Sequence, residues 1–170
     1  MCFQQVLMIL YSKVSVKEIF KKGKDYVWPR PERCPKCGSG RLWGHGYVAR
    51  YFEGFEESLW MKRWRCADCG GVHTMRPEGF WRRFRHSVTR IVKSLKEKIS
   101  VGGWLGDLGR QAQQYWWRGF GRQCGREGKT GERRLKILER MLERGILAAT
   151  HSLEFFRIQN LGDICFTPAG

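Results

Sequence analysis

Acidic side chains are scarce in this chain of 170 residues, where 16 Asp and Glu face 32 Lys and Arg and leave a net charge of +16. No carboxylate set, histidine–cysteine pair or phosphate-cradling loop has the spacing that catalysis requires, so we expect a protein that is not an enzyme. Long hydrophobic runs are also missing. The apolar run at residues 6–11 is too short to span a bilayer. No basic stretch precedes it and no small-residue cleavage site follows it, so we expect neither a membrane segment nor a signal peptide.

The positive charge is concentrated in the middle of the chain. Residues 81–134 carry 14 basic and 4 acidic side chains, a net charge of +10. Such a block suits a polyanionic partner, most often nucleic acid, although it could also be a cationic surface without a specific partner. Aromatic residues make up 14% and hydrophobic residues 42% of the chain, which is unlike the composition of a disordered protein.

Four of the seven cysteines occur in two CxxC pairs, each followed by glycine. A CxxC-G turn aims two thiolates at one point, and two such turns joined by a hairpin supply a tetrahedral set. This predicts a structural zinc ion, with iron or a redox dithiol as the alternatives. The predicted ligands are Cys34, Cys37, Cys66 and Cys69. The three isolated cysteines, Cys2, Cys124 and Cys165, are typical of a reducing compartment, so we expect a cytoplasmic protein.

Two histidines, His45 and His73, lie near the cysteine pairs in the sequence. Either could replace a thiol ligand, but four thiols already complete the set. We therefore interpret both as polar surface histidines.

The pattern along the chain indicates a small α+β protein. Ser15 and Glu18 fit a capping box of a short N-terminal helix. Alternating aromatic segments at residues 47–52 and 58–64 predict a β-hairpin between the cysteine pairs, with a third short strand at 72–75. We thus expect a zinc-ribbon β-hairpin module followed by a helix-turn-helix-like module and a C-terminal helix. The expected parts are an N-terminal helical lead-in (1–29), the zinc ribbon (30–80), the basic region (81–122), and a linker, helix and tail (123–170).

The basic region has the segment lengths of a trihelical helix-turn-helix unit: 86–99, a glycine-rich stretch at 101–109 that is at most a short irregular helix, and 110–120. If Trp116 and Phe120 face inward, helix 110–120 presents arginine and glutamine outward, which suits base recognition in the major groove. The predicted nucleic-acid contacts are Arg82, Arg83, Arg85, Arg90, Lys93, Arg110, Gln111, Gln114, Arg118 and Arg122.

The C-terminal part begins with a glycine-rich segment, residues 121–131, which predicts a flexible linker. An amphipathic helix is expected at 131–147, where it would pair with a partner protein or cover the core. Residues 150–170 show no clear period.

Three sequence segments carry a resemblance to a known family. They are CPKCGSGRLWGHGY from Cys34, WRCADCGGVHTMRP from Trp64, and QYWWRGF ending at Phe120. Together they resemble the N-terminal region of bacterial insertion-sequence transposases and their stand-alone relatives, in which a zinc ribbon precedes a helix-turn-helix that binds transposon-end DNA. The resemblance covers about residues 30–122. Only 50 residues follow Phe120, too few for the ribonuclease-H-like catalytic domain of such transposases.

The resemblance and the charge together predict a non-catalytic, zinc-dependent protein that binds duplex DNA. It would be an accessory or truncated transposase-related product of a mobile element, located in the cytoplasm at the nucleoid. One alternative is an RNA- or ribosome-associated ribbon protein with bases stacked on its aromatic residues. The other is a protein-interaction adaptor. The candidate stacking residues are Trp43, Tyr47, Trp60 and Trp64.

Overall fold

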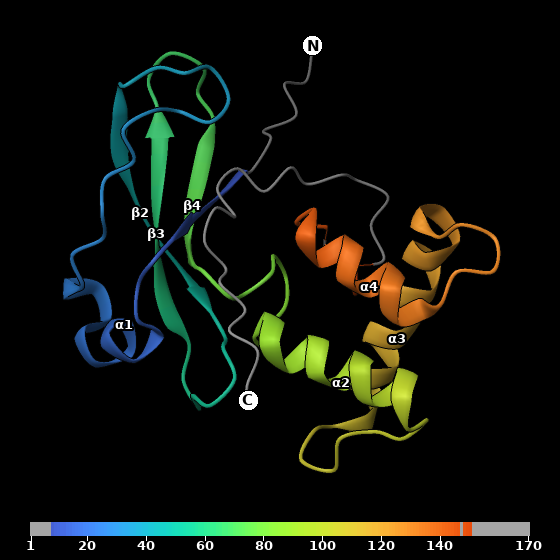
Figure 1. The fold of residues 1–170 in the computed structure, drawn as a ribbon. Helices are drawn as coiled ribbons and strands as arrows, with labels where there is room; N and C mark the ends of the chain where they lie inside the picture. The colour runs from blue at the N-terminus through green and yellow to red at the C-terminus, as the bar shows by residue number, and fades with distance from the viewer. Residues whose placement is uncertain (1–7, 147, 151–170) are drawn as a thin grey trace. The chain divides into compact units, whose positions relative to one another are not determined.

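The computed structural model describes residues 8–146 and 148–150, and within them the protein has a four-stranded mixed sheet and four α-helices. This confirms the predicted small α+β class. The chain divides into two compact units, and each is described by itself (Figure 1). The sheet unit ends at Val88, and the helical unit begins at Thr89.

The sheet unit contains strands in the order β1-β4-β3-β2. The β2–β3 and β3–β4 pairs are antiparallel, which agrees with the predicted hairpin and third strand. β1 pairs in parallel with β4, with Met8 opposite His73. All residues of β4 are buried, and β4 is an inner strand with neighbours on both sides. The strand bounds are Met8–Ser12 (β1), Leu42–Arg50 (β2), Leu59–Cys66 (β3) and Val72–Pro77 (β4).

The described N-terminal residues belong to this unit rather than to a separate helical lead-in. After β1, helix α1 (Val16–Lys22) begins at the predicted cap, where the Glu18 backbone N–H donates to Ser15 Oγ over 3.4 Å. A short 3₁₀ turn, η1 (Gly23–Asp25), follows, and α1 lies beside the sheet (Figure 1). The apolar residues of this segment complete the core of the sheet. That core consists of Ile19, Trp28, Phe52, Leu59, Met61 and Met75.

The helical unit contains α2 (Val88–Ser100) from its second residue on, together with α3 (Arg110–Glu127) and α4 (Arg134–Glu143). Residues 101–109 form turns without a helix, so the middle helix of the predicted trihelical unit is absent. The four glycines of this segment explain the difference, because glycine loses more backbone entropy in a helix than other residues do. α2 and α3 are therefore joined by an irregular loop.

Helix α3 continues well beyond the predicted end at residue 120 and includes most of the predicted linker. Burial of Phe120 and Gln123 offsets the low helix propensity of the nearby Gly121 and Gly125. The rest of that segment is held by Glu132, whose carboxylate accepts hydrogen bonds from the Lys129 backbone N–H and from the Arg140 guanidinium. The prediction of a flexible linker at residues 121–131 is therefore wrong.

Helix α4 is shorter than the predicted helix at 131–147, and its apolar side chains Ile137, Leu138 and Met141 are buried within the chain. Its pairing with a partner protein stays a prediction. Cys2, Cys165 and the tail beyond Thr150 lie outside the described residues. No helix in the described ranges has both the length and the apolar character needed to cross a bilayer.

Candidate metal centre and basic surfaces

The first cysteine pair lies in a tight knuckle closed by two backbone hydrogen bonds. The Gly38 N–H donates to the Cys34 carbonyl over 2.8 Å, and the Cys34 N–H donates to the Ser39 carbonyl over 2.7 Å. Gly38 has a φ of 77°, a left-handed conformation that glycine adopts without a steric penalty. The glycine after the second cysteine therefore allows the turn that brings the Cys34 and Cys37 side chains to one side.

The second knuckle repeats this geometry. The Gly70 N–H donates to the Cys66 carbonyl over 3.1 Å, the Cys66 N–H donates to the Gly71 carbonyl over 2.9 Å, and Gly70 has a φ of 66°. A further bond, 2.9 Å from the Ala67 N–H to the Arg41 carbonyl, ties the two knuckles together. Both lie at the end of the sheet where β3 ends and β4 begins.

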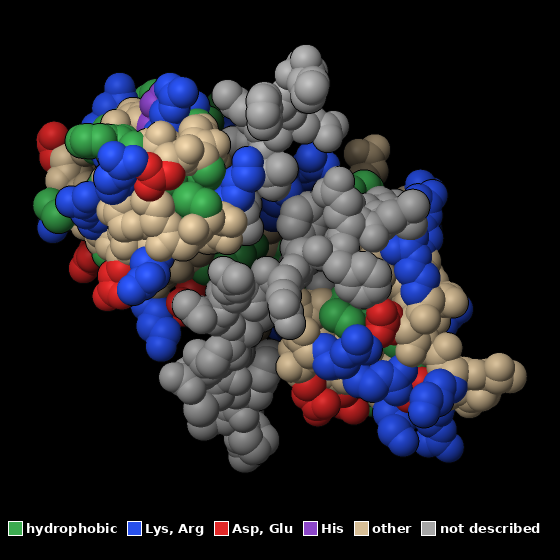
Figure 2. All heavy atoms as spheres, turned by 90° about the horizontal axis from the view of Figure 1, so that it is seen from above, with side chains coloured by type: hydrophobic (Ala, Val, Ile, Leu, Met, Phe, Trp, Pro, Cys, Tyr) green, Lys and Arg blue, Asp and Glu red, His purple; other side chains and the backbone are tan. Residues whose placement is uncertain are grey.

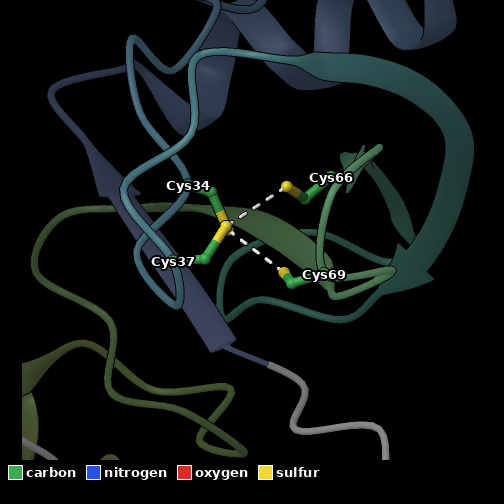
Figure 3. A group of neighbouring side chains, drawn as sticks. All are labelled: Cys34, Cys37, Cys66 and Cys69. Atoms are coloured by element: carbon green, nitrogen blue, oxygen red, sulfur yellow. Dashed lines mark hydrogen bonds between the residues drawn. The ribbon is translucent and has the colours of Figure 1, made fainter.

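The four thiols of the knuckles converge (Figure 3). All four Sγ atoms lie within 4.8 Å of one another. The Sγ atoms of Cys34 and Cys69, and likewise those of Cys37 and Cys66, are 3.6 Å apart. This exceeds the ~2.05 Å of a disulfide, and the four cysteines are free. A tetrahedral ion with metal–sulfur bonds of about 2.3 Å holds its sulfurs about 3.8 Å apart, so the cluster could hold a metal ion.

The thiols titrate as a coupled group. The pKa of Cys66 is lowered to about 7, first because a backbone N–H at Cys69 donates to its sulfur and then because the neighbouring thiols donate as well. At Cys37 the backbone N–H of Ser39 favours the thiolate, but desolvation and the bonds to the other thiols outweigh it and raise the pKa to about 12. Because the pKa values of Cys34 and Cys37 are raised, these thiols keep their protons in the absence of a metal, and binding of a metal to their sulfurs would release protons.

His73 corrects the prediction of a polar surface histidine. Its side chain is fully buried, and its Nε2 lies 3.2 Å from the Sγ of Cys34. Burial lowers its pKa, which favours the neutral imidazole. A neutral imidazole with hydrogen on Nε2 donates to the sulfur and orients it, as the outer partners of metal ligands commonly do. His45 lies in β2, is partly exposed, and is not part of the thiol cluster.

The loop from Gly79 to Val88, which we call the arginine loop, carries three of the predicted nucleic-acid contacts. Its ends meet where the Val88 N–H donates to the Gly79 carbonyl over 2.7 Å. The side chains of Trp81 and Phe84 are buried, so the interleaved aromatics pack inward rather than facing a partner. The basic side chains lie between them: Arg83 and Arg85 are exposed and Arg82 is partly exposed.

The buried side chain of Arg76 fixes the backbone of the arginine loop. Arg76 is only 5% exposed, its Nε donates to the Phe80 carbonyl over 3.0 Å, and its Nη2 donates to the Phe84 carbonyl. The guanidinium also lies over the Phe52 ring, 5.0 Å from its centroid. Burial lowers the pKa of Arg76 to about 10, which leaves the side chain charged at neutral pH.

Glu53 holds the other side of the arginine loop. Its two carboxylate oxygens accept hydrogen bonds from the Ser87 backbone N–H over 2.9 Å and from His86 Nδ1 over 2.8 Å. Its own backbone N–H donates to the Arg85 carbonyl over 2.8 Å. Although burial raises the pKa of Glu53, these hydrogen bonds outweigh it and leave the pKa lowered. No local sequence signal marks this role of Glu53.

Helix α3 brings five predicted contacts onto one face. At 100° per residue, they span 120° of the helix, opposite the buried Trp116 and Phe120. The inward orientation predicted for those two aromatics is confirmed. Figure 2 shows Lys and Arg side chains on the surfaces of both units. The α3 face consists of Arg110, Gln111, Gln114, Arg118 and Arg122, of which all but the partly exposed Gln114 are exposed.

The remaining predicted contacts lie on α2. Lys93 is exposed, whereas the guanidinium of Arg90 is 2.8 Å from the Asp107 carboxylate. This ion pair connects α2 to the loop before α3. The Arg90 guanidinium therefore has a structural role through this ion pair.

Sequence reasoning missed Gln113, the residue that organises that loop. Its side chain is fully buried and makes four hydrogen bonds. Oε1 accepts from Ser94 Oγ over 2.8 Å and from the Leu105 N–H over 2.9 Å. Nε2 donates to the Leu105 carbonyl over 2.8 Å and to the Leu108 carbonyl over 3.0 Å. The amide thereby uses its full bonding capacity, which fixes the loop without a second helix.

Of the four candidate stacking aromatics, one is open to solvent. Lys62 lies over the rings of Tyr47 and Trp64, 4.4 and 5.7 Å from their centroids, and Lys24 lies 4.2 Å from the centroid of Trp60. Trp43 is 61% exposed.

Comparison with known proteins finds no matching family, no matching curated protein and no matching solved structure. The function must therefore follow from the arrangement of the side chains.

Proposed function

We propose that this protein is a non-catalytic, zinc-dependent DNA-binding protein. The observation that carries the proposal is the convergence of four thiols from two matched knuckles, in a chain with a net charge of +16. A site with four sulfur ligands leaves no open position for a substrate, which favours a structural role. When bound, zinc would supply a cross-link between the two knuckles.

Zinc is the ion that this ligand set favours. Thiolates select soft or borderline metals, and a tetrahedral S₄ set is typical of zinc or iron. The buried His73 beside Cys34 supports a closed structural site, because it shields one sulfur from solvent.

DNA is the partner that the α3 face favours. Arginine can bond guanine and glutamine can bond adenine on their major-groove edges, and additional arginines can neutralise phosphates. Helix α3 is 18 residues long and presents these side chains on one side. The arginine loop of the sheet unit would add phosphate contacts, since its backbone is fixed by Arg76 and Glu53.

A metal assay tests the first part of the proposal. Protein purified without chelator should contain one zinc per chain by elemental analysis. Cys37→Ser should lower that stoichiometry, whereas Cys124→Ser should not, because Cys124 lies in α3 and is not one of the four clustered cysteines. Protein purified without chelator that contains no zinc, or zinc-loaded protein that melts at the same temperature after EDTA has removed its zinc, contradicts the structural zinc.

A titration with duplex DNA tests the second part. Affinity measured by fluorescence polarisation should fall steeply with salt, because phosphate contacts release counterions. Arg118→Ala on the α3 face should weaken binding by about 5- to 100-fold if it contacts a base, or reduce the salt slope by about one if it contacts a phosphate. The matched control is Arg133→Ala, an exposed arginine outside the α3 face. Equal effects of the two variants, or no binding at all, refute the assignment.

The mobile-element part of the proposal rests on the resemblance over residues 30–122. It predicts a neighbouring reading frame for a catalytic transposase, flanked by inverted repeats, and a cytoplasmic protein at the nucleoid. A genomic neighbourhood with neither feature refutes this part and leaves the DNA-binding proposal intact.

A further inference from the structure

Trp43 occupies an unusual place on the sheet unit. It is 61% exposed, although its neighbour Leu42 is almost fully buried against the cysteines. Because side chains alternate between the two faces of a strand, Trp43 lies on the face opposite the thiol cluster. The other aromatics of the hairpin that were considered for stacking are covered by lysines. No such cation lies over Trp43 in the part of the chain that the structure describes.

The neighbours of Trp43 are cationic. Arg65 is its direct cross-strand partner on β3, and side chains at such positions are about 5 Å apart at Cβ. Arg65 is exposed and has no acidic partner among the described residues. Arg63, two residues back on the same face, lies beside Gly46, where the β2–β3 register shifts.

We propose that Trp43, Arg65 and Arg63 form a binding site for single-stranded nucleic acid, separate from the α3 face. An unpaired base would stack on the open indole, and the attached phosphates would contact the two guanidinium groups. A paired base offers no free ring face, so duplex DNA is a poor ligand for this site. The arrangement suits the chemistry shared by single-stranded DNA and RNA. A base flipped out of a distorted duplex would also be an unpaired base that this site could bind.

Polarisation titrations with labelled oligo-dT, oligo-rU and a duplex of equal length test this site. Trp43→Ala should weaken single-strand binding by about 5- to 150-fold, the range that stacking of one base provides, and Trp43→Phe should retain most of the affinity. Arg65→Ala should lower the salt slope for single strands by about 0.7. Matched controls are Arg50→Ala, at the far end of the same strand, and Tyr51→Ala, just beyond that end and also 61% exposed. Neither should change binding.

The duplex arm separates this proposal from the preceding one. Loss of single-strand binding in Trp43→Ala with unchanged duplex affinity supports a distinct site, whichever sugar is preferred. A preference for oligo-rU identifies RNA as the source, and equal affinities indicate that base and phosphate alone are recognised. Identical affinities of Trp43→Ala and the wild type overturn the proposal. So does an equal loss for single strands and duplex, which would make Trp43 a general contact. Unchanged zinc content in the variant verifies that the fold is intact.

Discussion

Replacing Gln113 tests the most heavily bonded polar side chain of the helical unit. Gln113→Leu removes four hydrogen bonds and leaves partly buried backbone groups of Leu105 and Leu108 without their partner. At about 1 kcal/mol net for each bond, the loss should lower the free energy of unfolding by about 4 kcal/mol. Ser94→Ala removes only one of the four bonds and should cost about 1 kcal/mol.

Urea denaturation followed by circular dichroism measures these differences. The control is Gln111→Leu, because Gln111 lies on the same helix but is exposed, and such surface changes stay within about 0.5 kcal/mol. The amide network would not be what fixes the loop if Gln113→Leu cost less than about 1 kcal/mol, or if the two glutamine variants were equally stable.

Two further perturbations address the other buried polar contacts. Arg76→Met keeps a side chain of similar size but loses both hydrogen bonds to carbonyls of the arginine loop, so it should lower the free energy of unfolding by about 2–4 kcal/mol. It should also speed amide exchange at residues 80–87, measured by mass-spectrometric hydrogen exchange. Unchanged exchange there contradicts the role of Arg76 in fixing the loop. Hydrogen bonds from Arg140 lower the pKa of Glu132 to about 2. A lowered pKa in the folded state stabilises the fold above about pH 4.5 and ceases to do so as pH falls toward 2. Glu132→Gln should therefore melt below the wild type at pH 6 and converge with it near pH 2, whereas Glu139→Gln, on the exposed side of α4, should match the wild type throughout.

Local patterns were sufficient to predict the cysteine cluster and most elements. A CxxC-G turn is specified by five consecutive residues, so its geometry can be predicted without knowledge of the rest of the chain. The hairpin and the starts of α2 and α3 follow in the same way from alternation and from the helical period. The end of α3 was missed because packing of Phe120 and Gln123 outweighs the local weakness of glycine.

Long-range partners were not predictable from these patterns. Helical spacing places Gln113 on the same face as Trp116 and Phe120, but only the folded loop shows which groups its amide bonds. His73 is equally inconspicuous, since nothing near it indicates that Cys34 will lie against its ring. The strand β1 was missed as a sheet partner because parallel pairing needs a long crossover and has no turn signal of its own.

The parallel pairing of β1 with β4 determines the order in which the sheet unit can be completed during synthesis. Met8 leaves the ribosome early, but its partner His73 emerges only after both knuckles. The hairpin that carries the cysteines can therefore form first, whereas β1 can pair only after β4 has been synthesised. A shortened protein that begins at residue 30 would keep all four cysteines of the cluster and yet turn β4 into an open edge strand. Such edges recruit other chains, so the fragment should bind metal and aggregate.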